Sequence, residues 1–190
     1  MDTCAERAVQ VFREKVGTFF HKRYDEGDQC ASINLYDDVV AILETERTDV
    51  VPTLITLLGD GEASDMHYWI IAAMRGMGAR GKLSRNGMQA LLVHTESLGA
   101  GDYEEWYKSI NTLGFSSEGA DILLDFAENR LLSKCDIRGW RWLAFYIVGS
   151  LFQKHASLIS ASLKEKLRKE MEQETDPRQQ KCFQEVLSIM

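Results

Sequence analysis

The sequence predicts an all-α protein, a short right-handed solenoid of about five antiparallel helix pairs. Three observations predict this class. Apolar residues recur at helical spacing, a motif that opens with Asp returns at intervals of 37, 34 and 40 residues, and no segment alternates apolar and polar residues as a strand would. We expect one repeat domain over residues 1–190, with capping helices in 1–48 and helix pairs in 49–190.

Amphipathic segments predict the helices that precede each copy of the motif. Two N-terminal helices are expected at residues 4–23 and 33–45. The first helices of the later pairs are expected at 49–61, 86–99, 118–132 and 158–174. Short connections containing Gly, Asp or Ser join them to the next helices, as is usual for antiparallel neighbours.

The repeated motif predicts the second helix of each pair. An aspartate opens each copy, a tryptophan follows four residues later, and a glycine after an apolar residue closes it. The full copies are Asp65, Trp69 and Gly78; Asp102, Trp106 and Gly114; and Asp136, Trp140 and Gly149. Asp176, followed by Pro177, opens a fourth copy.

Each position of the motif has an expected role. The aspartate caps the first turn of its helix, and Pro177 suits the first helical position because it lacks an N–H. We expect Trp69, Trp106 and Trp140 to be core residues, and the closing glycines to end their helices in the left-handed conformation. Trp142 has no counterpart in the other copies, so we expect it to be partly exposed and available for binding.

These segments resemble HEAT repeats. Residues 50–78 have the HEAT order of apolar helix, Asp-containing turn, second helix and terminal apolar-Gly, and Arg141, Ala144 and Gly149 match positions of a second HEAT helix. The chain departs from the pattern in its shorter repeat (HEAT repeats have ~40–47 residues), in its tryptophans and in the absence of the arginine from the first two copies. The resemblance implies a HEAT- or armadillo-like solenoid, a fold whose curved surface usually binds other macromolecules.

The charge distribution favours a basic partner. The formal net charge is −7, and most of the excess acid falls in residues 1–65. A surface of this sign attracts basic proteins and repels nucleic-acid phosphates. Residues 164–174 alternate acids and bases at i,i+4 spacing, which indicates a solvated helix face and argues against a nucleic-acid or membrane-binding patch.

Targeting and cysteine patterns predict a cytoplasmic protein. Residues 1–17 carry charges throughout, unlike a signal peptide, and no apolar run approaches the roughly 20 residues that span a bilayer. The four cysteines are widely scattered, with no CxxC pattern and no close pairing with the histidines. We therefore expect reduced thiols and no zinc site.

We expect no catalytic residue, cofactor or metal. The chain has no phosphate-binding, metalloprotease, nucleophile-elbow or EF-hand motif, and its glycine-rich stretch 76–81 follows a predicted helix, so it indicates a helix end. The carboxylates near the turns are interpreted as caps and dipole partners, and each histidine stands alone in its segment. A hidden acid–base pair among these carboxylates is the less favoured alternative.

The sequence favours a non-enzymatic protein-binding module. Its size, acidity and lack of catalytic motifs resemble, by class, small acidic bacterial immunity proteins, which neutralise a cognate toxin by covering its active site. A basic toxin such as a nuclease would suit the charge, because carboxylates can mimic phosphates and steer association. The alternative is a HEAT-like scaffold or regulatory subunit of a larger complex, and a HEAT-like enzyme such as a lyase is less favoured. The oligomeric state is left open.

The expected partner-binding residues are acids at the turns and exposed residues of the second helices. They are Asp60, Glu62, Asp65, His67, Asp102, Tyr103, Glu104, Glu105 and Trp142. Tyr103 and Trp142 would serve as anchors at the centre of an interface. A role as helix cap or solvated surface is the alternative for every member of the set.

Overall fold

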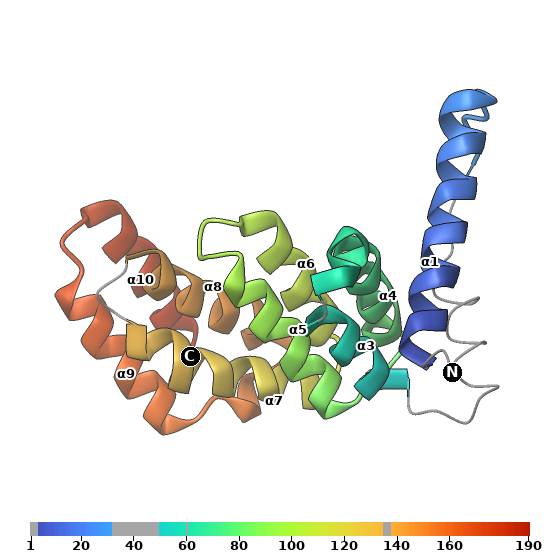
Figure 1. The fold of residues 1–190 in the computed structure, drawn as a ribbon. Helices are drawn as coiled ribbons and strands as arrows, with labels where there is room; N and C mark the ends of the chain where they lie inside the picture. Colours follow the sequence, from blue (N-terminus) through green and yellow to red (C-terminus); the bar gives the residue numbers. More distant parts are fainter. Residues whose placement is uncertain (1–3, 32–49, 60, 135–137) are drawn as a thin grey trace. The chain divides into compact units, whose positions relative to one another are not determined.

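The computed structural model describes residues 4–31, 50–59, 61–134 and 138–190. Within these ranges the chain is helical and contains no strand, so the predicted all-α class is confirmed. The α-helices (Figure 1) are α1 (Cys4–Phe20), α3 (Val50–Gly59), α4 (His67–Ala79), α5 (Arg85–Ser97), α6 (Tyr103–Leu113), α7 (Ser117–Phe126), α8 (Arg138–His155), α9 (Ala161–Gln173) and α10 (Pro177–Ile189). The helix expected at 33–45 lies outside the described residues, and every other segment predicted to be helical contains an α-helix.

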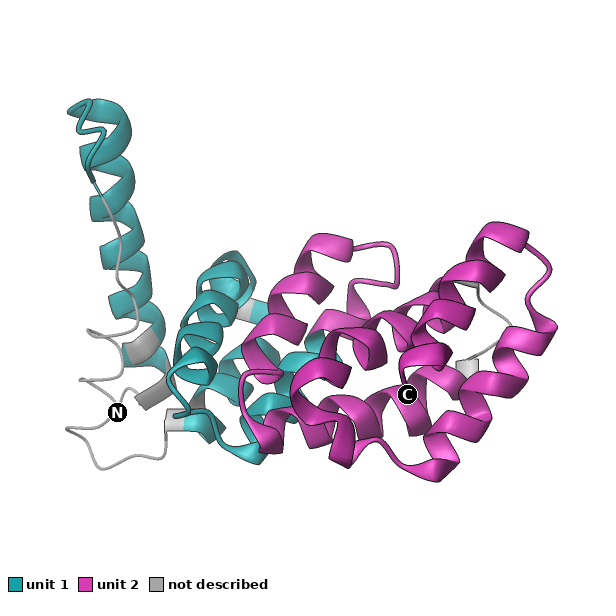
Figure 2. Ribbon diagram, turned by 180° about the vertical axis from the view of Figure 1, so that it is seen from behind, with its two compact units in different colours: residues 1–94 teal, residues 95–190 magenta. Residues whose placement is uncertain are grey.

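The chain divides into two compact units, residues 1–94 and 95–190, with the boundary inside α5 (Figure 2). In the first unit, α3 contacts both α1 and α4. The core side chains of this unit are almost fully excluded from solvent and include Phe12, Leu54, Leu57, Ile70 and Met74. Helix α5 approaches α3 closely at Gly87, where an added Cβ would lie 2.9 Å from Val51 Cγ1.

In the second unit, α7 contacts both α6 and α8, and α10 contacts both α8 and α9. The rings of Phe145 and Phe183 join α8 to α10, because they stack in parallel with their centroids 3.8 Å apart. At Gly119 an added Cβ would lie only 2.1 Å from the Leu113 carbonyl oxygen, so a glycine is required where α7 begins against the end of α6. These contacts give the second unit a continuous apolar core.

The predicted aspartate caps are confirmed in two copies of the motif. Asp102 accepts a hydrogen bond from the Glu105 backbone N–H at the start of α6, and Asp176 accepts one from the Arg178 N–H at the start of α10. The prediction is wrong for Asp65, because a 3-10 turn over Gly61–Met66 already places this residue in helical backbone before α4 begins. Asp136 lies outside the described residues.

The closing glycines do not end their helices in the predicted left-handed conformation, although Gly114 does stand at the end of α6. Gly78 lies inside α4, Gly149 lies in the middle of α8, and Gly114 follows α6 with a φ of −66°. The left-handed glycine after α4 is Gly81, with a φ of 66°. Gly114 instead permits close packing, since an added Cβ would lie 2.7 Å from a Leu151 methyl group.

The tryptophans divide into core and boundary residues. Trp106 and Trp140 are buried as predicted, and their rings meet edge to face at 6.2 Å. The prediction is wrong for Trp69, which is half-buried and meets three other aromatic rings. These rings belong to Phe19, Phe20 and Tyr68. Trp142 is half-buried, which agrees with its expected partial exposure.

Candidate functional site

The start of α6 carries four of the predicted partner-binding residues on one turn. The preceding turn reverses at Gly99, which has a φ of 94°, and the Trp106 indole donates a hydrogen bond of 3.0 Å to the Gly99 carbonyl oxygen. The Asp102 side chain then caps the helix at 3.3 Å. A buried hydroxyl contact of 3.0 Å between Thr95 and Ser109 holds the end of α5 against α6. The backbone that presents Asp102, Tyr103, Glu104 and Glu105 is therefore fixed by buried contacts.

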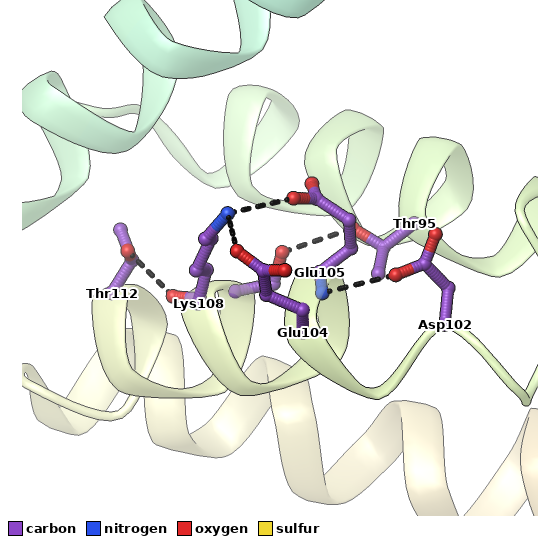
Figure 3. Close-up of polar contacts among 7 residues, drawn as sticks. Thr95, Asp102, Glu104, Glu105, Lys108 and Thr112 are labelled. Carbon is purple, nitrogen blue, oxygen red and sulfur yellow. Dashed lines mark hydrogen bonds and ion pairs between the residues drawn. The ribbon is translucent and has the colours of Figure 1, made fainter.

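Two of these acids share one base. The Lys108 ammonium lies 2.6 Å from a Glu104 carboxylate oxygen and 3.1 Å from a Glu105 oxygen, as Figure 3 shows. The hydrogen bond to Glu104, followed by the one to Glu105, raises the pKa of Lys108 above its usual value. Glu104 nevertheless keeps 77% of its side-chain surface exposed, whereas Glu105 keeps 19%. Glu104 is therefore the acid of this turn that can best meet a partner.

Aromatic rings adjoin the acidic turn. Tyr103, which is 57% exposed, meets the Trp142 ring of α8 edge to face at 5.2 Å. On α8 itself, the rings of Trp142 and Tyr146 stack at 5.1 Å with an angle of 9° between their planes. We call Asp102, Tyr103, Glu104, Trp142 and Tyr146 the α6–α8 surface. It combines the two residue types that the sequence analysis selected for partner binding.

A small hollow opens on the α6–α8 surface. Its volume is about 210 Å³, and it is lined by Tyr103, Gly139, Trp142 and Gln179. Sequence reasoning missed Tyr146, Gly139 and Gln179. The i,i+4 spacing of Trp142 and Tyr146 was the available signal, because such residues share a helix face. Nothing in the sequence indicated that Gln179 of α10 would join them.

The partner-binding residues predicted in the first unit do not belong to the α6–α8 surface. The Asp65 carboxylate forms a two-pronged ion pair with the Arg13 guanidinium of α1, with distances of 3.0 and 3.2 Å. The hydrogen bond from Arg13 holds the pKa of Asp65 below its usual value. The rings of His67 and His94 approach to 6.3 Å, and both residues are half-buried. Asp60 and the Glu62 side chain lie outside what the structure describes.

A second hollow of about 290 Å³ lies beside the turn that follows α7. The Glu128 carboxylate at its wall accepts hydrogen bonds from the Ser160 and Ser162 hydroxyls and lies 3.2 Å from the Lys166 ammonium. The Ser162 hydrogen bond contributes most to holding the pKa of Glu128 below its usual value. These contacts fasten the turn to the start of α9, so we assign Glu128 a structural role.

An aromatic cluster in the first unit was also missed by the sequence analysis. Its rings are connected through contacts between α1, the turn after α1, and α4: Phe19, Phe20, Tyr24, Tyr68 and Trp69. Tyr24 and Tyr68 are exposed. The i,i+4 spacing of Phe20 and Tyr24 could have signalled part of it.

The described residues contain neither a metal-binding cluster nor a helix suited to crossing a membrane. Within the described part of the chain, no three His, Cys, Asp or Glu side chains gather closely enough to hold a metal ion. Among the helices that the structure describes, none combines the length and apolar character needed to cross a membrane.

Comparison with protein-family models, curated proteins and solved structures gives no significant match for this chain.

Proposed function

We propose that the chain is a non-enzymatic protein-binding module that engages a basic protein through the α6–α8 surface. The observation that carries this proposal is the adjacency of an exposed carboxylate, Glu104, and an exposed aromatic ring, Tyr103, on a rigid helix end. Aromatic residues are enriched among the residues that dominate interface energies. A charged rim speeds association with a partner of opposite sign.

Structural roles account for three other carboxylates that sequence reasoning selected. Asp102 caps α6, Glu105 pairs with Lys108, and Asp65 pairs with Arg13. These contacts support binding and structural roles in preference to acid–base catalysis.

The proposed architecture is a short right-handed HEAT-like solenoid of antiparallel helix pairs. Contacts between successive helices support it, since α3 touches α1 and α4, and α7 touches α6 and α8. Arg141 occupies the position matched to the HEAT arginine, where it pairs at 2.9 Å with Glu170 of α9 and at 3.5 Å with Glu174. In this proposal, the arginine fastens one helix pair to the next.

The specific form of the proposal is an inhibitor of a basic bacterial toxin, such as a nuclease, acting in the cytoplasm. The exposed Glu104 carboxylate on the α6–α8 surface supports a basic partner. Glu104 would occupy a phosphate-binding position of such a toxin, and Tyr103 and Trp142 would anchor the contact. The alternative is a scaffold subunit, which would bind several subunits of one assembly.

The test is capture from the native host lysate at low and high salt, with wild-type protein, Glu104→Lys and Glu118→Lys. Glu118 is the matched control because it is also an exposed glutamate in the first turn of a helix of the second unit. We expect one basic protein, retained at low salt, whose capture falls about tenfold with Glu104→Lys, a loss of roughly 1.4 kcal/mol, and is unchanged by Glu118→Lys.

Equal capture by both variants would overturn the placement of the binding surface. Several subunits of one assembly, retained at both salt concentrations, would replace the toxin-inhibitor form with the scaffold. Thermal unfolding of each variant confirms that the exposed substitutions leave the fold intact.

A further inference from the structure

We propose that the hollow beside Trp142 receives the guanidinium group of a partner arginine. This inference rests on the proposed function and specifies what the α6–α8 surface recognises. The hollow is small, at about 210 Å³, and two of its four lining residues are aromatic. A cavity of this size suits one side chain and is too small for a helix.

The rings of the hollow are suited to a cation. The face of an aromatic ring carries negative potential, and a guanidinium within about 6 Å of the centroid is attracted to it, most strongly over tryptophan. The parallel contact with Tyr146 and the edge-to-face contact with Tyr103 fix the Trp142 indole in place. A fixed ring loses little side-chain freedom when the partner binds.

Gly139 lines the hollow and lies close to the turn before α6. It contributes no side chain to the wall, and an added Cβ would lie 3.1 Å from the Ala100 Cβ. Gln179, from the first turn of α10, adds a polar residue to the lining. An arginine can stack its planar group on an indole while its N–H donors meet polar groups at the edge.

Acidic residues adjoin one wall of the hollow, that of Tyr103. Asp102 and Glu104 flank Tyr103 in the chain, and Lys108 is held by carboxylates. A base precedes each of the other three lining residues in the sequence: Arg138, Arg141 and Arg178. Of these, Arg141 is paired with Glu170 of α9. The acidic turn therefore complements an incoming guanidinium at the Tyr103 wall.

The test is an NMR titration of the intact chain with a blocked peptide, acetyl-Gly-Arg-Gly-Arg-Gly-amide. The control peptide contains citrulline at both arginine positions, so it keeps the shape and removes the charge. The Trp142 indole N–H signal is assigned by its loss in Trp142→Phe. We expect this signal to shift with the arginine peptide and the citrulline peptide to bind about three- to tenfold more weakly.

Two tyrosines provide a matched pair of variants. Tyr103 and Tyr107 are both 57% exposed on α6, but only Tyr103 lines the hollow. We expect Tyr103→Leu to weaken the arginine response and Tyr107→Leu to leave it unchanged. Tyr103→Phe retains the ring and should restore most of the response.

An equal response to the two peptides, or no shift at Trp142, would overturn the inference. If capture of a basic protein still depends on Glu104 in that case, the proposed function stands and only the occupant of the hollow is wrong. If Trp142 discriminates arginine from citrulline but Glu104→Lys does not affect capture, the hollow is supported and the proposed function fails.

Discussion

Two segments of the chain, 65–78 and 102–114, share the spacing of Asp, Trp and Gly but use these residues differently. In the second segment, Trp106 is 1% exposed and donates a hydrogen bond to Gly99. In the first segment, Trp69 is half-buried. The spacing therefore predicts which residues share a helix face, while the elements packed against that face determine how deeply each residue is buried.

Asp102 caps its helix and Asp65 does not, because the backbone at the two positions differs. A capping residue needs backbone outside the helical region, so that its side chain can fold back onto the first turn. Asp102 follows a turn that contains Gly99 and meets this condition. Asp65 belongs to a 3-10 turn that runs into α4, and its carboxylate turns to Arg13 instead.

The largest expected difference between the two segments lies in the tryptophans. Trp106→Ala should lower the free energy of unfolding by about 3–5 kcal/mol, because it leaves a cavity in a core that cannot fully collapse. Trp69→Ala should cost about half of that or less, since solvent already reaches the ring. Urea unfolding followed by circular dichroism measures both. Equal losses of unfolding free energy in the two variants would mean that the difference in burial between Trp106 and Trp69 does not affect stability.

Alanine substitution should destabilise the fold more at Gly114 than at Gly149. An added Cβ at Gly114 would lie 2.8 Å from the Ile110 carbonyl oxygen, so Gly114→Ala should destabilise the fold by about 1–3 kcal/mol. At Gly149 the nearest atom is a Val186 methyl at 3.3 Å, and alanine is a better helix former inside α8. Gly149→Ala should therefore stay within about 1 kcal/mol of wild type in the same unfolding experiment. A loss at Gly149 as large as that at Gly114 would show that α8 and α10 cannot adjust.

The sequence predicted correctly those features that depend on residues close together in the chain. Helical periodicity predicted all the described α-helices, and the caps Asp102 and Asp176 follow from the residues just after them. Trp69 was misassigned because two of the rings that meet it, Phe19 and Phe20, belong to α1, which is distant in the chain. The acidic turn of the candidate site was visible as a run in the sequence, but Gln179 was not, since α10 brings it to Trp142 only in the folded chain.

The two aspartates should also differ in their contribution to stability. Asp102→Ala removes the side-chain acceptor from the first turn of α6 and should cost about 1 kcal/mol. Asp65→Ala should cost less, because exposed ion pairs contribute little. The midpoints of urea unfolding test this order. A larger loss at Asp65 would indicate that the contact with α1 organises the first unit.

The ion pair of Asp65 also predicts a dependence on pH. Arg13 holds the pKa of Asp65 below its ordinary value of 3.8, so the unfolded chain takes up this proton at a higher pH than the folded chain does. The stabilisation is therefore complete above pH 3.8 and is lost as the pH falls through the lowered, folded-state pKa. Asp65→Asn removes the titrating group and retains its size.

The melting temperature of wild type should exceed that of Asp65→Asn near neutral pH, and the difference should shrink steadily as the pH falls below 3.8. High salt should reduce the same difference, because both partners are about half exposed. Arg13→Gln should abolish the pH-dependent difference between aspartate and asparagine at position 65. If the difference persists in Arg13→Gln, Asp65 is stabilised by a group other than Arg13, and the contrast with Asp102 would need another explanation.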